Sequence, residues 1–161
     1  MPKKIWLFIL IFIAVFALDQ LSKFLAIEYL GINKMPNFNT AFKSEYMDLV
    51  LVYNDGVAFS MLSFLKGYLK YLHLFLLLVL SGYLLWQKSF LKEHFIAFAM
   101  ILAAGSSNLL DRFVHVGVVD MFFWHKWFEF AVFNVADVMI NIGVALIIIK
   151  ELFFKVKKAQ A

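Results

Sequence analysis

The chain contains no cysteine and few charged residues. Only 16% of its 161 residues are Asp, Glu, Lys or Arg, whereas 64% are hydrophobic. The absence of cysteine excludes disulfides, thiolate metal sites and cysteine nucleophiles. A hydrophobic share far above the roughly 45 to 50% of soluble domains indicates an integral membrane protein.

Four apolar segments are long enough to cross a bilayer, because a spanning helix needs about 20 mostly apolar residues. We expect spans at about residues 5–26, 68–86, 95–113 and 133–154. The first of them contains Asp19 and Lys23 and has no small-residue cleavage site, so we interpret it as a permanent span rather than a removable signal. With no internal repeat, the sequence predicts one all-α membrane domain over residues 1–161, interrupted by one insert.

The insert covers about residues 31–63 and is too polar to span. Residues 48–53 are rich in β-branched and aromatic residues, Asn54-Asp55-Gly56 has turn chemistry, and residues 57–61 could return as a second strand. This pattern predicts a small extracytoplasmic β-hairpin or sheet. In an ordinary hairpin Asn54 is only a turn residue, and that interpretation stays open.

Lysines gather at both ends of the chain and in the loop at residues 87–94. By the positive-inside rule these regions are cytoplasmic, so the polar stretches after the first and third spans face outward. The basic residues follow the membrane and form no patch with interleaved aromatics, so we expect no nucleic-acid partner.

Polar side chains concentrate between Gly105 and Gly143, at the outer ends of apolar spans. They are Asn108, Asp111, Arg112, Asp120, Asn134 and Asp137. Ionisable groups are costly there and usually mark function. Asp19 and Lys23 share a helical face at i, i+4 and form either an ion pair with Lys23 snorkelling or a structural support of the site. The small residues 103–107 predict close helix packing.

The residues available for chemistry favour carboxylates. The histidines at 73, 94, 115 and 125 lack HExxH spacing, so we expect no metal, and His73 is interpreted as an interfacial or satisfied histidine. No serine lies in a G-x-S-x-G elbow. Two adjacent carboxylates, in contrast, share a proton and activate water without metal, cofactor or covalent intermediate.

Three outer aspartates compete for such a pair. Asp111 adjoins Arg112, and a carboxylate committed to a guanidinium is a poor proton shuttle. Asp120 has no neighbouring cation, and Asp137 lies just inside a helix start, where an anion is favoured. The residues favour Asp120 with Asp137, and a structural ion-pair cluster remains the alternative.

Five blocks carry a family resemblance. They are DQLSK at 19–23, YNDGVAFS at 53–60, NLLDR at 108–112, VVD at 118–120 and FNVAD at 133–137. In this order and spacing the chain resembles the lipoprotein signal peptidases (signal peptidase II), four-span aspartic proteases of bacterial inner membranes. The resemblance implies that Asp120 and Asp137 are catalytic, that Asn54, Asn108, Arg112 and Asn134 line the site, and that Asp19 and Asp111 support it. Ser107 stands where the family often has glycine.

The expected function follows from this resemblance. It is removal of signal peptides from diacylglyceryl-modified prolipoproteins, before the lipidated cysteine, at the periplasmic side of the inner membrane. The expected partners are prolipoproteins and membrane lipid, and the chain is expected to act as a monomer without cofactor. A proton-coupled transporter would carry its charges toward the bilayer midplane, and a structural subunit would tolerate Asp to Asn changes.

Overall fold

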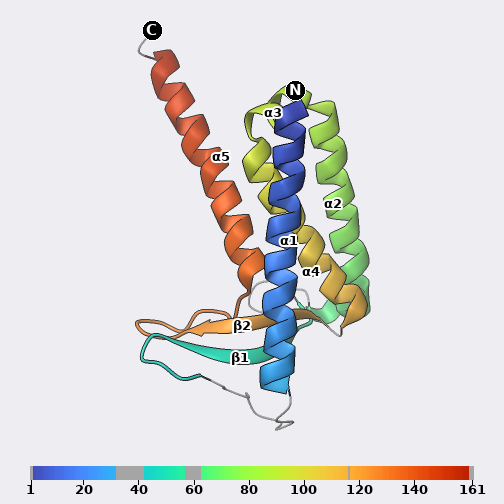
Figure 1. Cartoon of the computed structure of the whole chain (residues 1–161), viewed down its shortest axis with the longest axis vertical. Coiled ribbons are helices and arrows are strands. Elements are labelled where there is room, and N and C mark those ends of the chain that lie inside the picture. Colours follow the sequence, from blue (N-terminus) through green and yellow to red (C-terminus); the bar gives the residue numbers. More distant parts are fainter. Residues whose placement is uncertain (1, 32–41, 57–62, 116, 160–161) are drawn as a thin grey trace.

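The computed structural model describes residues 2–31, 42–56, 63–115 and 117–159. It is mostly helical, with a small sheet at the end of the helices that lies opposite both termini (Figure 1). The elements in order are α1 (Pro2–Gly31), β1 (Met47–Asn54), the 3-10 helix η2 (Ser63–Tyr68), α2 (Leu69–Trp86), α3 (Lys88–Glu93), α4 (Phe95–Val114), β2 (Val118–Trp124) and α5 (Val135–Ala159).

Three helices in the described part of the chain are long and apolar enough to cross a membrane: α1 from Lys3, α2 and α4. Large apolar side chains such as Leu10, Phe75 and Leu78 are exposed on their outer faces, as expected for surfaces that meet lipid. α5 has 25 residues and occupies the place expected for the fourth span. The arrangement with four spans stays a prediction.

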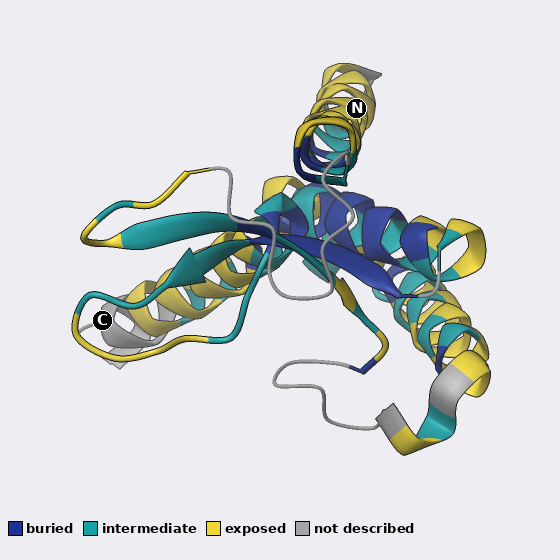
Figure 2. Cartoon of the chain, turned by 90° about the horizontal axis from the view of Figure 1, so that it is seen from below, coloured by how far each residue is buried: buried dark blue, intermediate teal, exposed yellow. Residues whose placement is uncertain are grey.

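Helix α4 lies at the centre of the helical bundle and contacts α1, α2 and α5. Ala103 and Ala104 are fully buried and form one apolar cluster with Val15 of α1 and Ala136 of α5. Small residues allow this approach, so the prediction of close helix packing at residues 103–107 is confirmed. Buried residues gather where the helices meet the sheet (Figure 2).

The sheet has two antiparallel strands, β1 and β2. The predicted strand at residues 48–53 lies within β1, whereas the predicted return strand at 57–61 lies outside the described residues. The partner of β1 is β2, so the expectation that the insert contains the whole sheet is wrong. No strand was predicted at residues 118–124, which form β2.

The inner half of β2 explains this pairing. Val119 and Met121 are buried and form an apolar cluster with Ala26 and Leu30 at the end of α1. The same contact accounts for the extra length of α1, which ends at Gly31 rather than near residue 26. Burial of this apolar surface holds the sheet across the end of the bundle.

Candidate active site

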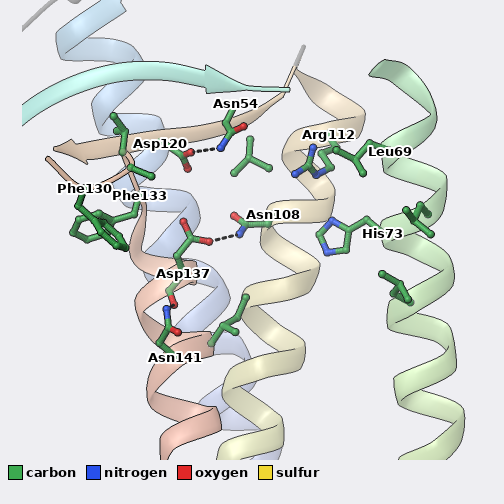
Figure 3. Close-up of a pocket in the computed structure, with 16 residues that line it drawn as sticks. Asn54, Leu69, His73, Asn108, Arg112, Asp120, Phe130, Phe133, Asp137 and Asn141 are labelled. Atoms are coloured by element: carbon green, nitrogen blue, oxygen red, sulfur yellow. Dashed lines mark hydrogen bonds between the residues drawn. The ribbon is translucent and has the colours of Figure 1, made fainter. Parts of the chain in front are cut away.

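A cavity of about 350 Å³ lies between the sheet and the adjoining ends of α2, α4 and α5 (Figure 3). Its polar lining residues come from five elements distant in the chain, β1, α2, α4, β2 and α5: Asn54, His73, Asn108, Arg112, Asp120, Asp137 and Asn141. The remaining wall is largely apolar. The structure therefore brings five of the eight residues expected at the site to one cavity, and the other three lie directly behind it.

Asp120 points from β2 into this cavity and is 2% exposed. Its Oδ2 accepts a hydrogen bond from Asn54 Nδ2 at 3.0 Å, and its Oδ1 accepts one from Asn134 Nδ2 at 2.7 Å. Burial and the nearby charge of Asp137 together raise the pKa of Asp120 to about 7. This carboxyl group can therefore hold or release a proton near neutral pH.

Asp137 lies in the first turn of α5, on the same cavity. Its Oδ1 accepts a hydrogen bond from Asn108 Nδ2 at 3.0 Å, and its Oδ2 accepts one from the backbone N–H of Asn134 at 3.2 Å. In return, Asn134 Oδ1 accepts from the backbone N–H of Asp137 at 2.9 Å. This reciprocal pair caps the start of α5 and fixes the carboxylate.

Asn134 connects the two carboxylates. Its side chain is fully buried, and its amide nitrogen donates to Asp120 Oδ1, to Asn108 Oδ1 at 3.1 Å and, more weakly, to the carbonyl of Val119 at 3.3 Å. Because the same residue caps α5, the positions of Asp120 and Asp137 depend on each other.

Beneath the carboxylates lies a buried lysine. Lys23 is 2% exposed, and its Nζ lies 2.6 Å from Asp19 Oδ2, 2.7 Å from Asp111 Oδ2 and 2.7 Å from Asn108 Oδ1. The interpretation that Lys23 snorkels toward headgroups is wrong, because its ammonium group points into the bundle. There it meets three acceptors, which is how a charge is kept in an apolar interior.

Asp111 does not pair with Arg112. It binds Lys23 and accepts a hydrogen bond from the backbone N–H of Val119 at 3.1 Å. Neighbouring residues on a helix point in different directions, so adjacency in the chain was a poor guide to the partner. The predicted pairing of Asp111 with Arg112 is therefore wrong, and the carboxylate of Asp111 is instead committed to Lys23.

Gln20 and Ser107 also belong to the hydrogen-bond network around Lys23, and the sequence did not predict this. Gln20 Nε2 donates to Ser107 Oγ at 2.9 Å and to Asp111 Oδ1 at 2.8 Å, and Ser107 Oγ donates to Asp19 Oδ2 at 2.6 Å. Asp19 Oδ1 accepts from the backbone N–H of Ala136 at 2.7 Å. The signal for Gln20 was its i, i+3 spacing from Lys23, which places both on one face of α1.

Asn54 and Arg112 tie the end of β1 to the cavity. Asn54 Oδ1 accepts from the backbone N–H of Gly56 at 3.0 Å while its amide binds Asp120, so the interpretation of Asn54 as only a turn residue is wrong. Arg112 Nη2 donates to the carbonyl of Gly56, but Arg112 Nε is buried without a partner in the part of the chain that the structure describes. A Cβ at Gly117 would overlap the backbone of Asn54, so only glycine fits there.

Side chains of metal-ligand type also meet at the far end of the helices, away from this cavity. One possible ligand atom from each of three residues lies within 4.8 Å of the other two: Glu93, His94 and Glu151. The ring of His94 is hydrogen bonded to Glu151 at 2.8 Å, and Lys150 lies 3.6 Å from Glu93. This arrangement forms a contact between the junction of α3 and α4 and helix α5.

Comparison with known proteins gives a consistent result along almost the whole chain. The family described as Signal peptidase (SPase) II matches residues 11–153. A lipoprotein signal peptidase of Campylobacter jejuni (strain 81-176) is 63% identical over 147 residues, covering 91% of this chain and 88% of that one. One from Helicobacter pylori (strain Shi470) is 46% identical over 156 residues, covering 97% and 93%. A solved bacterial membrane enzyme has a TM-score of 0.77 at 26% identity, covering 96% and 92%.

Proposed function

The chain belongs to the signal peptidase II family, and from this membership we propose that it is an aspartic endopeptidase that cleaves diacylglyceryl-modified prolipoproteins. Family membership makes the chain a membrane peptidase that removes signal peptides from prolipoproteins. The proposal adds the catalytic residues, Asp120 and Asp137, and the cleaved bond, which is the peptide bond before the lipidated cysteine.

The observation that carries this proposal is the joint placement of the two carboxyl groups. Both line one cavity and both are hydrogen bonded to Asn134. Carboxyl groups that share a cavity and feel each other's charge ionise as a coupled pair that shares one proton. The pKa of Asp120, raised to about 7, supports a pair in which one carboxyl group is protonated and the other is ionised near neutral pH.

The proposed reaction uses the two carboxyl groups in complementary roles. The ionised carboxylate takes a proton from a water molecule, whose oxygen attacks the scissile carbonyl carbon, while the protonated carboxyl donates to the carbonyl oxygen. The C–N bond of the resulting gem-diol then breaks as a proton passes to the leaving amine. The products are the carboxylate of the signal peptide and the free amine of the lipidated cysteine.

The surrounding residues have supporting roles in this proposal. Asn54, Asn108 and Asn134 orient the two carboxylates through the hydrogen bonds described above. Arg112 offers its unpaired Nε–H to a backbone carbonyl of the substrate. Asp19 and Asp111 hold Lys23 beneath the pair and so fix α1, α4 and the start of α5 relative to one another.

The membrane arrangement is part of the same proposal. α5 is the fourth span, both termini are cytoplasmic, and the cavity opens at the periplasmic side of the inner membrane. In a monomer the apolar faces of α2 and α5, which flank the cavity, are exposed and can contact the signal peptide and the acyl chains. The lysine-rich ends of the chain support this orientation.

Purified protein in detergent, with no metal or ATP added, tests the proposal on a lipidated precursor peptide. Asp120→Asn and Asp137→Asn are each expected to abolish cleavage and to retain the wild-type fold by circular dichroism. Asp48→Asn, which removes a carboxylate from the same sheet away from the cavity, is the matched control and is expected to cleave normally. Wild-type rates in either cavity variant would reject the aspartic mechanism.

A further inference from the structure

His73 is the one polar side chain that α2 contributes to the lining of the cavity. The other lining residues of this helix are Leu69, Leu72 and Leu76. His73 is half-buried and lies across the cavity from Asp120 and Asp137, on the side of Arg112 (Figure 3). An imidazole on such a wall must be satisfied by another protein group or by whatever fills the cavity.

The protein supplies no such partner among the described residues. His94 and His125 are paired with Glu151 at 2.8 Å and Asp48 at 3.1 Å, but no hydrogen bond is formed by His73 within the described chain. Its ring nitrogens therefore remain available to a molecule in the cavity.

The neighbouring guanidinium group points to the kind of atom that His73 meets. Arg112 and His73 line the same side of the cavity, and the buried Nε of Arg112 also lacks a partner within the described chain, so two donors without a protein acceptor lie at or just behind this side. An imidazole keeps at least one N–H donor in either protonation state. On this side of the cavity the two donors lie beside Leu69, Leu72 and Leu76, which suits a carbonyl oxygen on a largely apolar ligand, and Arg112 repels a cation from this side.

We propose that His73 is a substrate-contacting residue whose ring N–H binds a carbonyl oxygen of the lipid-modified substrate, beside Arg112. This proposal rests on the proposed function. Two parts of the substrate carry such an oxygen: the ester groups of the diacylglyceryl moiety and the peptide backbone near the cleavage site. Since His73 acts on binding rather than on proton transfer, it determines how tightly the substrate is held.

Steady-state kinetics on a diester-lipidated precursor peptide test the contact. His73→Phe keeps a ring of similar size but has no donor, and we expect KM to rise about three- to tenfold with kcat within about twofold. His73→Gln keeps an N–H donor and is expected to restore most of the lost affinity. Tyr71→Phe removes a hydroxyl from the same helix outside the cavity lining and is expected to match the wild type.

A second precursor, with ether-linked alkyl chains in place of the esters, identifies the oxygen. If His73 binds an ester carbonyl, the wild type loses affinity for the ether precursor and His73→Phe loses nothing more. If it binds the peptide, the defect of His73→Phe persists on both precursors. His73→Met, a second apolar replacement, must reproduce His73→Phe, and melting temperatures identify any variant that fails to fold.

An unchanged KM in both apolar variants would overturn the proposal, as would a fall in kcat without a change in KM. Either result differs from a failure of the proposed function, in which the wild-type protein itself would leave both precursors uncleaved.

Discussion

Asp120→Asn is expected to stabilise the protein against unfolding, and to do so increasingly as the pH rises. In the folded protein, burial and the nearby Asp137 raise the pKa of Asp120 from 3.8 to about 7. The folded protein therefore favours the protonated carboxyl group, and ionisation of Asp120 lowers the free energy of unfolding. An asparagine of nearly the same shape cannot ionise and avoids this cost.

The sign and the pH window follow from these two pKa values. Below about pH 4 the carboxyl group is protonated in the folded and unfolded states, and it contributes no pH dependence. Between about pH 4 and 7 the unfolded state releases its proton first, so the stability of the wild type falls as the pH rises. Above about pH 7 the ionised carboxylate lowers the free energy of unfolding by its full amount. For pKa values of 3.8 and about 7, that amount is at most about 4 kcal/mol.

The substitution also has a cost of its own. Both Asn54 and Asn134 donate to the carboxylate, so the NH2 group of an asparagine at this position would face a donor and lose one hydrogen bond, worth about 1 to 2 kcal/mol. The net gain is therefore about 2 to 3 kcal/mol at pH 9 and close to zero at pH 5. For a chain of this size, that gain corresponds to a rise of about 5 to 10 °C in melting temperature.

Tryptophan fluorescence during heating, in detergent at pH 5, 7 and 9, measures this difference for the wild type and the variant. Glu28→Gln, which removes an exposed carboxylate from α1, controls for the change in net charge and is expected to shift all three temperatures equally. A difference between Asp120→Asn and wild type that stays constant from pH 5 to 9 would refute the reasoning, since it would mean that Asp120 ionises as readily in the folded state as in the unfolded one.

Three further substitutions test the supports of the site. Asn134→Ala removes the cap of α5 and leaves buried acceptors unpaired, so unfolding in detergent should show a loss of about 2 to 4 kcal/mol, and peptide cleavage should be lost. Lys23→Met leaves two buried carboxylates without a cation and is expected to cost about 3 to 5 kcal/mol by the same unfolding assay, whereas Lys88→Met, at an exposed position, should be neutral. Gly117→Ala pushes the end of β1 away and should reduce the cleavage rate at least tenfold, while Gly82→Ala, with open space around it, should leave the rate unchanged.

The spans could be predicted closely because their signal is local. The expected ranges 68–86 and 95–113 differ by at most one residue at either end from α2 and α4, since a change from apolar to polar composition marks where each helix ends. The convergence of Asp120 and Asp137 on one cavity was also predictable, because costly polar groups at the same end of several spans must meet one another.

Contacts between distant segments could not be predicted in the same way. Nothing near residues 118–124 identified them as the partner of β1, because the pairing depends on the apolar contact of Val119 and Met121 with α1. The partner of Asp111 was missed for a related reason. Lys23 reaches it from another helix, and the chain alone suggested the adjacent Arg112. His73 was interpreted from α2 alone, without the cavity beside it.

The pairing of β1 with β2 has a consequence for biosynthesis. Asn54 leaves the ribosome long before Asp120, and Asn134, which bridges to Asp137, is made later still. A nascent chain that ends before α5 therefore lacks Asp137 and Asn134, and the cavity is incomplete. If the proposed catalytic pair is right, a newly made copy gains its second carboxylate, and with it peptidase activity, only when α5 is added.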